Sequence, residues 1–377
     1  MSLRSKAQVL EEELVGRTES NEDAPRGNPV CDLVWREPWN VSWSPNRGVP
    51  AGLAIDEERI AQHMLTRRPG GHFASKRKED DIVEVQTGVH NGYATGQPIL
   101  IQIRNKDARE SDYSFIPNHP RPGHQDLPMH LRSGGFADLR GGGSSSARLT
   151  AGIVAAAALV EPLLGDIHID AHVGAIGSIQ SAPIDECPEE WANELCQQLR
   201  CRDPAASVGM KECIETVRKE RNSIGSRVDV RISNLPHGLG EPWFDGLEPA
   251  LGRAYLSIPA ARAIAFGRGF DVVEMTGLEH NNPWGGSTDH PLQEGERPDG
   301  SIAGLSSGSD LYAKIAFKPP SSIAQEQTTL DLEDGTQKPL VVKGRHDPVL
   351  GPRAVSVARA MTTLVLCDLI LRKRDAL

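Results

Sequence analysis

Apolar and polar residues alternate along this chain with two periods, one typical of strands and one typical of helices. Short alternating or continuous apolar runs predict strands at 82–86, 99–104, 228–232, 263–275, 312–317 and 340–343. Apolar residues three and four positions apart predict helices at 56–66, 150–164, 189–200, 207–221, 247–258 and 354–373, with Asp56 and Ser207 as N-caps. Strands and helices do not alternate regularly and no GxGxxG follows a strand, so the pattern favours a layered α+β fold over a Rossmann domain.

The two most apolar stretches, 151–164 and 354–371, match membrane spans poorly. The first is too short, and the second contains Arg359 and Asp368. Both are therefore predicted to be buried helices. The N-terminal part is polar and acid-rich and has no apolar leader pattern. We expect a divergent, partly disordered extension over 1–45 and a single domain over 46–377.

Charge and cysteine content restrict the possible partners and location of the protein. The formal net charge is −10, which argues against wholesale binding to nucleic acid or to an anionic membrane, so an anion site has to be local. The six cysteines form no CxxC pair and have no histidine at zinc spacing. These features favour a reduced, cytoplasmic protein without a metal site.

Two basic segments are candidate anion sites. Arg67 and Arg68 open a stretch that continues with three more basic residues at 76–78, and the arginine fork suits carboxylate and phosphate groups. The loop PRPGH at 120–124 places Arg121 and His124 between turn-forming residues, and an imidazole is the usual general acid or base near neutral pH. The alternatives are a solvated charged loop and a structural histidine.

The segment DLRGGGSSSARLT at 138–150 carries the strongest signal. Consecutive glycines let the backbone approach a ligand closely, and serines at a helix start present N–H groups and hydroxyls where the helix dipole favours anions. The segment lacks the GKS or GKT ending of a P-loop, which excludes an ATPase of that type. A flexible linker is the alternative, although linkers rarely run directly into a long buried helix.

Two further segments offer cationic and hydroxyl donors near the C-terminus. KPPSS at 318–322 follows a predicted strand, and GRHDP at 344–348 precedes the last predicted helix. Each could be an ordinary turn. The adjacent pair His346 and Asp347 is not a metal motif, because neighbours in regular structure do not readily share one ion.

In this order, the segments resemble the chorismate synthase family, whose pattern runs RRPG, RPGH, GGGRSSAR, KPTSS and GRHDP. The resemblance extends from about Gly48 to the C-terminus and includes GVHNGYATGQPI at 88–99 and GPRAVSVARAM at 351–361. It implies a β-α-β sandwich and a homotetramer in the cytoplasm. It also implies a carbon–oxygen lyase of the shikimate pathway of aromatic amino acid biosynthesis, which eliminates phosphate from 5-enolpyruvylshikimate 3-phosphate by an anti-1,4-elimination and requires reduced FMN without net redox change.

The resemblance also implies roles for individual residues. Substrate phosphate and carboxylates would be held by Arg67, Arg68, Arg121 and Arg148, and protonation around the flavin would be set by His124 and Asp347. Flavin contacts would come from Ser145, Ser146, Ala260, Lys318, Ser321, Ser322 and Arg345. Several fixed cations and N–H donors are what an anionic flavin phosphate and a trianionic substrate need.

The chain departs from the family pattern at the ligand shell. The family's N-terminal FGESHG histidine, which is implied to assist phosphate departure, has no equivalent, because the region reads VWREPWNVSW and no histidine lies within 1–62. Trp35, Trp39 and Trp43 occupy this segment, and Ser144 replaces the first arginine of GGGRSSAR. His72 is a candidate replacement acid. Losing one general acid typically slows a reaction by about 10² to 10⁴.

Three functions therefore stay open from the sequence. The first is a working chorismate synthase with a relocated acid. The second is a diverged paralogue that acts on another anionic cyclic substrate in specialised metabolism. The third is a non-catalytic subunit.

Overall fold

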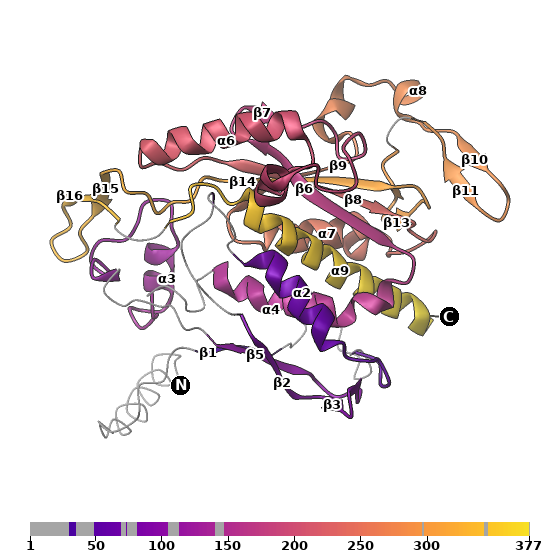
Figure 1. Ribbon diagram of the computed structural model, residues 1–377, viewed down its shortest axis with the longest axis horizontal. Coiled ribbons are helices and arrows are strands. Elements are labelled where there is room, and N and C mark those ends of the chain that lie inside the picture. Colours follow the sequence, from indigo (N-terminus) through magenta and orange to yellow (C-terminus); the bar gives the residue numbers. More distant parts are fainter. Residues whose placement is uncertain are drawn as a thin grey trace, which may run out of the picture.

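The structure, a computed structural model, describes residues 30–34, 49–68, 73, 81–104, 113–139, 147–295, 298–342 and 346–376. Within these residues a five-stranded sheet and a three-stranded sheet enclose a layer of helices (Figure 1). This is the β-α-β sandwich that the sequence resemblance implied. The expected N-terminal extension, with its three tryptophans, lies outside the described residues apart from 30–34.

The five-stranded sheet has the order β7-β6-β8-β14-β9, and its neighbours are antiparallel. The strands are β6 (His168–Ile176), β7 (Ile179–Gln180), β8 (Ser226–Ser233), β9 (Ala261–Phe266) and β14 (Leu311–Phe317). In β14 every second residue is buried, so alternate side chains face the helices while the others face away. The loop after β14 and the segments before β8 and β9 contribute to the site described below.

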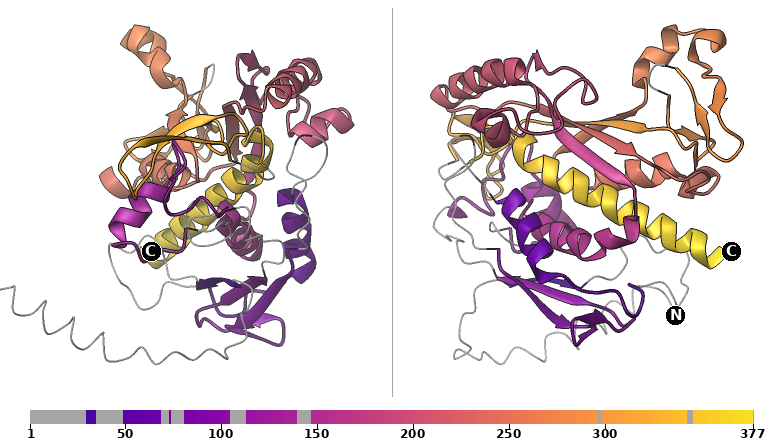
Figure 2. Two further views of the ribbon diagram at one scale, coloured as in Figure 1. Left: turned by 90° about the vertical axis from the view of Figure 1, so that its left-hand side faces the viewer. Right: turned by 45° about the vertical axis from the view of Figure 1, so that its right-hand side comes forward.

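The helix layer is made of α2 (Glu57–Arg67), α4 (Thr150–Val160), α7 (Leu247–Leu256) and the long C-terminal α9 (Gly351–Ala376). Helix α9 contacts β6 and β8 on one side and α2, α4 and α7 on the other (Figure 2). The three-stranded sheet, in the order β1-β5-β2, comprises β1 (Val30–Val34), β2 (Val83–Thr87) and β5 (Leu100–Arg104). It closes the sandwich through contacts between β5 and α4.

The two apolar stretches are buried helices, as predicted. The segments Ala147–Leu164 and Gly351–Arg374 are long and apolar enough to cross a membrane by length and composition alone, yet 67% of each most apolar window is buried inside the fold. Helix α4 is buried on nearly every side, since it lies between α2, α9 and β5. Both helices thus supply the hydrophobic core.

Shorter elements surround these layers. Helix α3 (Asp126–Arg132) lies beside the hairpin of β15 (Gln327–Leu330) and β16 (Gln337–Leu340), whereas α5 (Glu194–Leu199) and α6 (Pro204–Lys219) pack together near β6 and β7. The remaining hairpins are β3–β4 (Val89–His90, Tyr93–Ala94), β10–β11 (Trp284–Gly286, Pro291–Gln293) and β12–β13 (Ser301–Ile302, Leu305–Ser306). One α-helix, α8 (Gly277–His280), and the 3₁₀ turns η2 (Ala147–Leu149), η3 (Glu161–Leu164), η4 (Trp243–Asp245) and η5 (Gly269–Glu274) complete the described elements.

Several details of the predicted elements were wrong. The strand expected over 340–343 is β16, which ends at Leu340, and the helix expected over 189–200 begins only at Glu194. The strand expected over 263–275 ends at Phe266, because Gly267 turns the chain with a φ of 52° and a 3₁₀ turn follows. The cap of α6 is Asp203, whose carboxylate accepts from the backbone N–H groups of Ala205 and Ala206, and Ser207 lies inside the helix. Strand β6 was not predicted, although it lies inside the large sheet.

Candidate functional site

The PRPGH loop and the KPPSS loop meet at the end of β14. Lys318 Nζ donates hydrogen bonds to the Gly123 carbonyl and to Ser321 Oγ, the latter at 2.9 Å. Ser321 Oγ donates to the same Gly123 carbonyl at 2.7 Å, and an Arg121 terminal nitrogen donates to Ser322 Oγ at 3.0 Å. Two loops about 200 positions apart therefore form one cluster, here called the anion cluster, of Arg121, His124, Lys318, Ser321 and Ser322.

Backbone geometry fixes this meeting point. Gly123 has a φ of 65°, and a Cβ there would lie 3.4 Å from Ser321 Oγ, so glycine allows both the turn and the close approach. Ala260 has a φ of 72°, and its carbonyl accepts from the Lys318 backbone N–H at 3.0 Å. Thr329 Oγ1, on β15, donates to the Pro120 carbonyl. Ala260, expected to contact the flavin, thus adjoins the anion cluster.

Electrostatics in the anion cluster centre on Asp126, at the start of α3. Burial by itself would raise the pKa of Asp126, but hydrogen bonds from Arg121 and His124 outweigh burial and hold the pKa below its ordinary value. Burial and the nearby Arg262 lower the pKa of Lys318. The anion cluster therefore combines two cationic side chains, an imidazole and two hydroxyls, and the ionised Asp126 lies beside it.

A second cluster, the Asp81 cluster, joins Arg67 and Arg148. Arg67 donates to Asp81 Oδ2 at 3.0 Å, to Thr150 Oγ1 at 3.2 Å and to the Arg148 carbonyl at 3.3 Å, and Arg148 lies 2.8 Å from Asp81 Oδ1. Arg67 is only 2% exposed. Burial raises the pKa of Asp81, and the charges of Arg67, Arg68 and Arg353 oppose that shift. Two arginines thus contact one buried carboxylate, and the charges of two more act on it.

Contacts through residues 223–224 connect the KPPSS loop of the anion cluster to the GRHDP segment. Ser223 Oγ donates to the Pro320 carbonyl at 2.7 Å, and the Ile224 backbone N–H donates to the Pro348 carbonyl at 2.9 Å, which places KPPSS next to the GRHDP segment. Asp347 Oδ2 lies 2.6 Å from a terminal nitrogen of Arg353, the arginine whose charge acts on Asp81. The predicted site residues that the structure describes therefore lie in one region.

Several predicted residues fall outside the described part of the chain: Ser145, Ser146 and Arg345, together with His72 and Ser144. Conversely, two carboxylates of the site were not singled out from the sequence. Asp126 stands two residues after His124, and Asp81 ends the acidic run 79–81 that follows the basic run. A charge-balance argument for the neighbouring arginines would have drawn attention to both.

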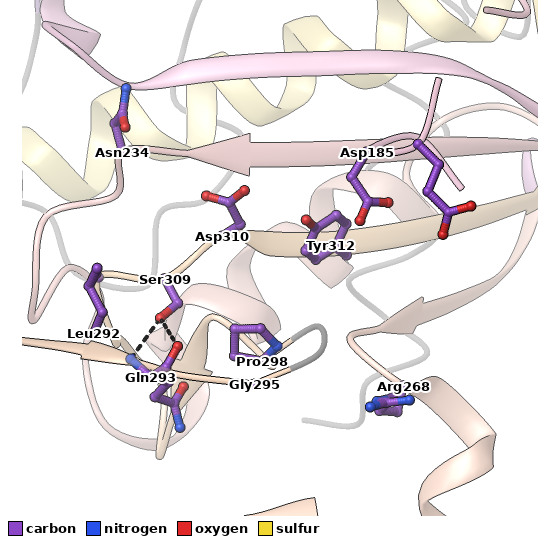
Figure 3. A pocket seen from close by; sticks show the side chains of 12 residues that line it. Asp185, Asn234, Arg268, Leu292, Gln293, Gly295, Pro298, Ser309, Asp310 and Tyr312 are labelled. Atoms are coloured by element: carbon purple, nitrogen blue, oxygen red, sulfur yellow. Dashed lines mark hydrogen bonds between the residues drawn. The ribbon is translucent and has the colours of Figure 1, made fainter. Parts of the chain in front are cut away.

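A polar pocket of about 780 Å³ lies elsewhere, at the opposite end of β14 (Figure 3). Asp310 and Tyr312, at the beginning of the strand, line it together with Ser309 and Gln293, which are hydrogen-bonded at 3.0 Å. Lys318 follows the other end of the strand, which puts the two regions roughly 20 Å apart at about 3.3 Å per residue. The pocket is separate from the anion cluster.

The fold and the two clusters define an α+β protein with a local site suited to an anionic small molecule. The sequence profile of the family described as chorismate synthase matches residues 47–371. A chorismate synthase of Aeropyrum pernix is 42% identical over 88% of this chain and 87% of its own length, and one of Roseiflexus castenholzii is 41% identical over 93% and 98%. The chain belongs to the chorismate synthase family.

Structural comparison agrees at the level of the fold. A crystal structure of chorismate synthase matches with a TM-score of 0.63 and covers 87% of each chain, at 24% sequence identity. Membership of the family makes the protein an enzyme of the phosphate-eliminating lyase type, within a flavin-dependent family whose substrate is a phosphorylated small molecule.

Proposed function

We propose that this protein catalyses the reduced-FMN-dependent anti-1,4-elimination of phosphate from 5-enolpyruvylshikimate 3-phosphate. The observation that carries the proposal is the convergence of the PRPGH and KPPSS loops, which brings Arg121, His124, Lys318 and two hydroxyls together. These residues come from segments of the family pattern that are far apart in sequence. Phosphate departure creates negative charge, and preorganised cations stabilise such charge strongly in a partly buried site.

The described donors fit a phosphate-bearing flavin. Lys318 offers an ammonium group, Ser321 and Ser322 offer hydroxyls, and the Ala260 backbone shapes the adjoining wall. Ser145, Ser146 and Arg345 are proposed as further flavin contacts. When bound, reduced FMN would supply electron density to the substrate ring and accept the ring proton.

The arginines divide into two roles in this proposal. Arg121 donates from a terminal nitrogen to Ser322 Oγ of the KPPSS loop, and Arg68 caps the C-terminus of α2; both are proposed to bind substrate phosphate or carboxylate. Arg67 and Arg148 are buried against Asp81 and supply positive potential from beneath the site. His124 and Asp347 set protonation around the flavin.

We also propose a cytoplasmic homotetramer that binds neither nucleic acid nor membrane. The net charge of −10 supports the lack of such partners. Assembly is supported by large apolar side chains in the region of η5 and α8, where Phe270 is 84% and Leu278 92% exposed.

The direct test is an anaerobic assay with photoreduced FMN and 5-enolpyruvylshikimate 3-phosphate, followed by phosphate release and product absorbance. We expect turnover, with a loss of about 10² or more for Lys318→Ala and for Arg121→Ala. Oxidised FMN serves as the control without turnover. Absence of product at high enzyme concentration would exclude this function.

A second function is favoured by one observation, the absence of any histidine from 1–62 where the family pattern has one. A diverged paralogue would act on another anionic cyclic substrate. Titration of reduced FMN with and without 5-enolpyruvylshikimate 3-phosphate separates the two functions. Flavin binding that the substrate leaves unchanged supports the paralogue, and tighter flavin binding in its presence supports the synthase. A non-catalytic subunit is excluded if the purified protein alone turns over any substrate.

A further inference from the structure

Asp126 makes four polar contacts that converge on the two functional residues of the PRPGH loop. Its Oδ2 accepts from the Arg121 backbone N–H at 3.0 Å and from Arg121 Nε at 2.8 Å. Its Oδ1 accepts from the Arg121 terminal nitrogen Nη2 at 2.8 Å and lies 2.7 Å from His124 Nδ1. The side chain of Asp126 is 3% exposed. One buried carboxylate therefore uses both oxygens on Arg121 and His124.

These contacts determine which nitrogen of His124 carries a proton. Arg121 Nη2 also lies 3.1 Å from His124 Nδ1, so an unprotonated Nδ1 could accept from the guanidinium. In that tautomer, however, the Nδ1 lone pair would face the ionised Asp126 oxygen at 2.7 Å. Because the pKa of Asp126 is held low, the carboxylate is the acceptor and Nδ1 is the donor. Nε2 then remains to exchange a proton with a ligand.

The same carboxylate sets the direction of Arg121. With Nε and Nη2 bound to Asp126, the second terminal nitrogen, Nη1, points to Ser322 Oγ at 3.0 Å. The rings of Tyr113 and Phe115 lie 5.7 Å and 5.9 Å from the guanidinium carbon. The planar fork has little freedom left, so its remaining donor edge faces the KPPSS loop.

We infer that Asp126 is the positioning residue of this site, which fixes the Nδ1–H tautomer of His124 and aims Arg121 at the KPPSS loop. The expected effect of Asp126 on catalysis rests on the proposed function. The tautomer of His124 can be measured whether or not the proposed function is correct. An orienting carboxylate behind a catalytic imidazole works in the same way in hydrolase triads.

The test combines nitrogen NMR with kinetics. In protein labelled with ¹⁵N-histidine, the His124 signal is assigned by its loss in His124→Gln, and we expect the Nδ1–H form in the wild type. Asp126→Asn should shift the signal toward the other tautomer or a mixture. In the assay above, Asp126→Asn should lower kcat by about 10². The tautomer of His124 is the readout that a purely structural role of Asp126 would not change.

A matched control is Asp170→Asn. Asp170, on β6 at the far end of the large sheet, also pairs with one arginine and one histidine, Arg202 at 2.5 Å and His168 at 3.4 Å. This variant should leave the His124 signal and kcat unchanged. A wild-type His124 in the Nε2–H form overturns the inference even if Asp126→Asn does not fold. If the protein shows no turnover but His124 has an Nδ1–H signal that depends on Asp126, the tautomer assignment is confirmed. Only the proposed function is then excluded.

Discussion

At the scale of single residues, the buried carboxylates determine what the arginines of this protein can do. Asp81 holds Arg67 and Arg148, whereas Asp126 holds the equally buried Arg121 and directs its terminal nitrogen Nη1 to Ser322 Oγ of the KPPSS loop. A buried arginine without a counter-charge is strongly unfavourable. The two carboxylates therefore differ in what they hold: Asp81 is shared by two buried arginines, whereas Asp126 is shared by Arg121 and His124.

This difference predicts a stability effect at Asp81. Asp81→Asn keeps the shape of the side chain but leaves two buried arginines without their counter-charge, and we expect the free energy of unfolding to fall by about 3–5 kcal/mol. Urea unfolding at pH 7 measures the change. Glu84→Gln is the control, because its pair with Arg104 at 3.3 Å is solvent-exposed and should contribute only a small fraction of that amount. Equal effects of the two variants would contradict the role given to Asp81.

At the scale of elements, a polar contact connects three helical segments beside the apolar core. Glu161, in the 3₁₀ turn η3, lies 2.9 Å from His63 Nε2 of α2 and 2.5 Å from an Arg359 terminal nitrogen of α9. Burial alone would raise the pKa of Glu161, but the hydrogen bonds and charges of His63 and Arg359 lower it from 4.5 to about 2. The ionised carboxylate thus stabilises the packing of these helices.

The lowered pKa of Glu161 predicts that the free energy of unfolding decreases in acid. Because the folded-state pKa of Glu161 is depressed, its contribution is complete above about pH 4.5 and is lost as the pH falls toward 2. We expect Glu161→Gln to lower the free energy of unfolding by about 2–3 kcal/mol at pH 7. The difference from wild type should shrink steadily below pH 4.5. Urea unfolding at pH 7, 4 and 3 measures this difference in the free energy of unfolding. Glu215→Gln, on the surface of α6, is the control. A difference between Glu161→Gln and wild type that is independent of pH would refute the role given to Glu161.

At the scale of the whole molecule, assembly should depend on the apolar side chains of the region at η5 and α8. Phe270, Val273 and Leu278 are each more than 80% exposed, which is costly for a monomer in water. The β10–β11 hairpin and α8 extend away from the sandwich in the same part of the molecule (Figure 1). This region is the strongest candidate for contact with a second copy of the chain.

We therefore expect sedimentation velocity to show a tetramer for the wild type. A double variant, Phe270→Glu with Leu278→Glu, should sediment as a smaller species, because each charge would have to be buried without a partner on assembly. Glu274→Gln, on the same 3₁₀ turn, should leave the mass unchanged. A wild-type monomer, or a tetramer that survives the double variant, would show that this surface is not the interface.

The sequence alone determined the composition of the core and the chemistry of the loops. The apolar stretches that form α4 and α9 are buried as predicted, because removing so much apolar surface from water is strongly favourable. The order of the basic and glycine-rich segments was sufficient to predict the family and the sandwich. Local signals sufficed because each rests on residues that are neighbours in the chain, as with Asp56, which caps α2.

The tertiary structure decided the features that depend on residues distant in sequence. Strand β6 alternates apolar and polar residues over nine positions, but its place inside the large sheet comes from pairing with β8, more than 50 positions later. The contact of Arg121 with Ser322, the burial of Arg67 and Arg148 on Asp81, and the proton on His124 Nδ1 follow from side chains that only the fold brings together. Sequence patterns record which groups are present, but hydrogen bonding and burial act over a few ångströms in space, and only the folded chain sets those distances.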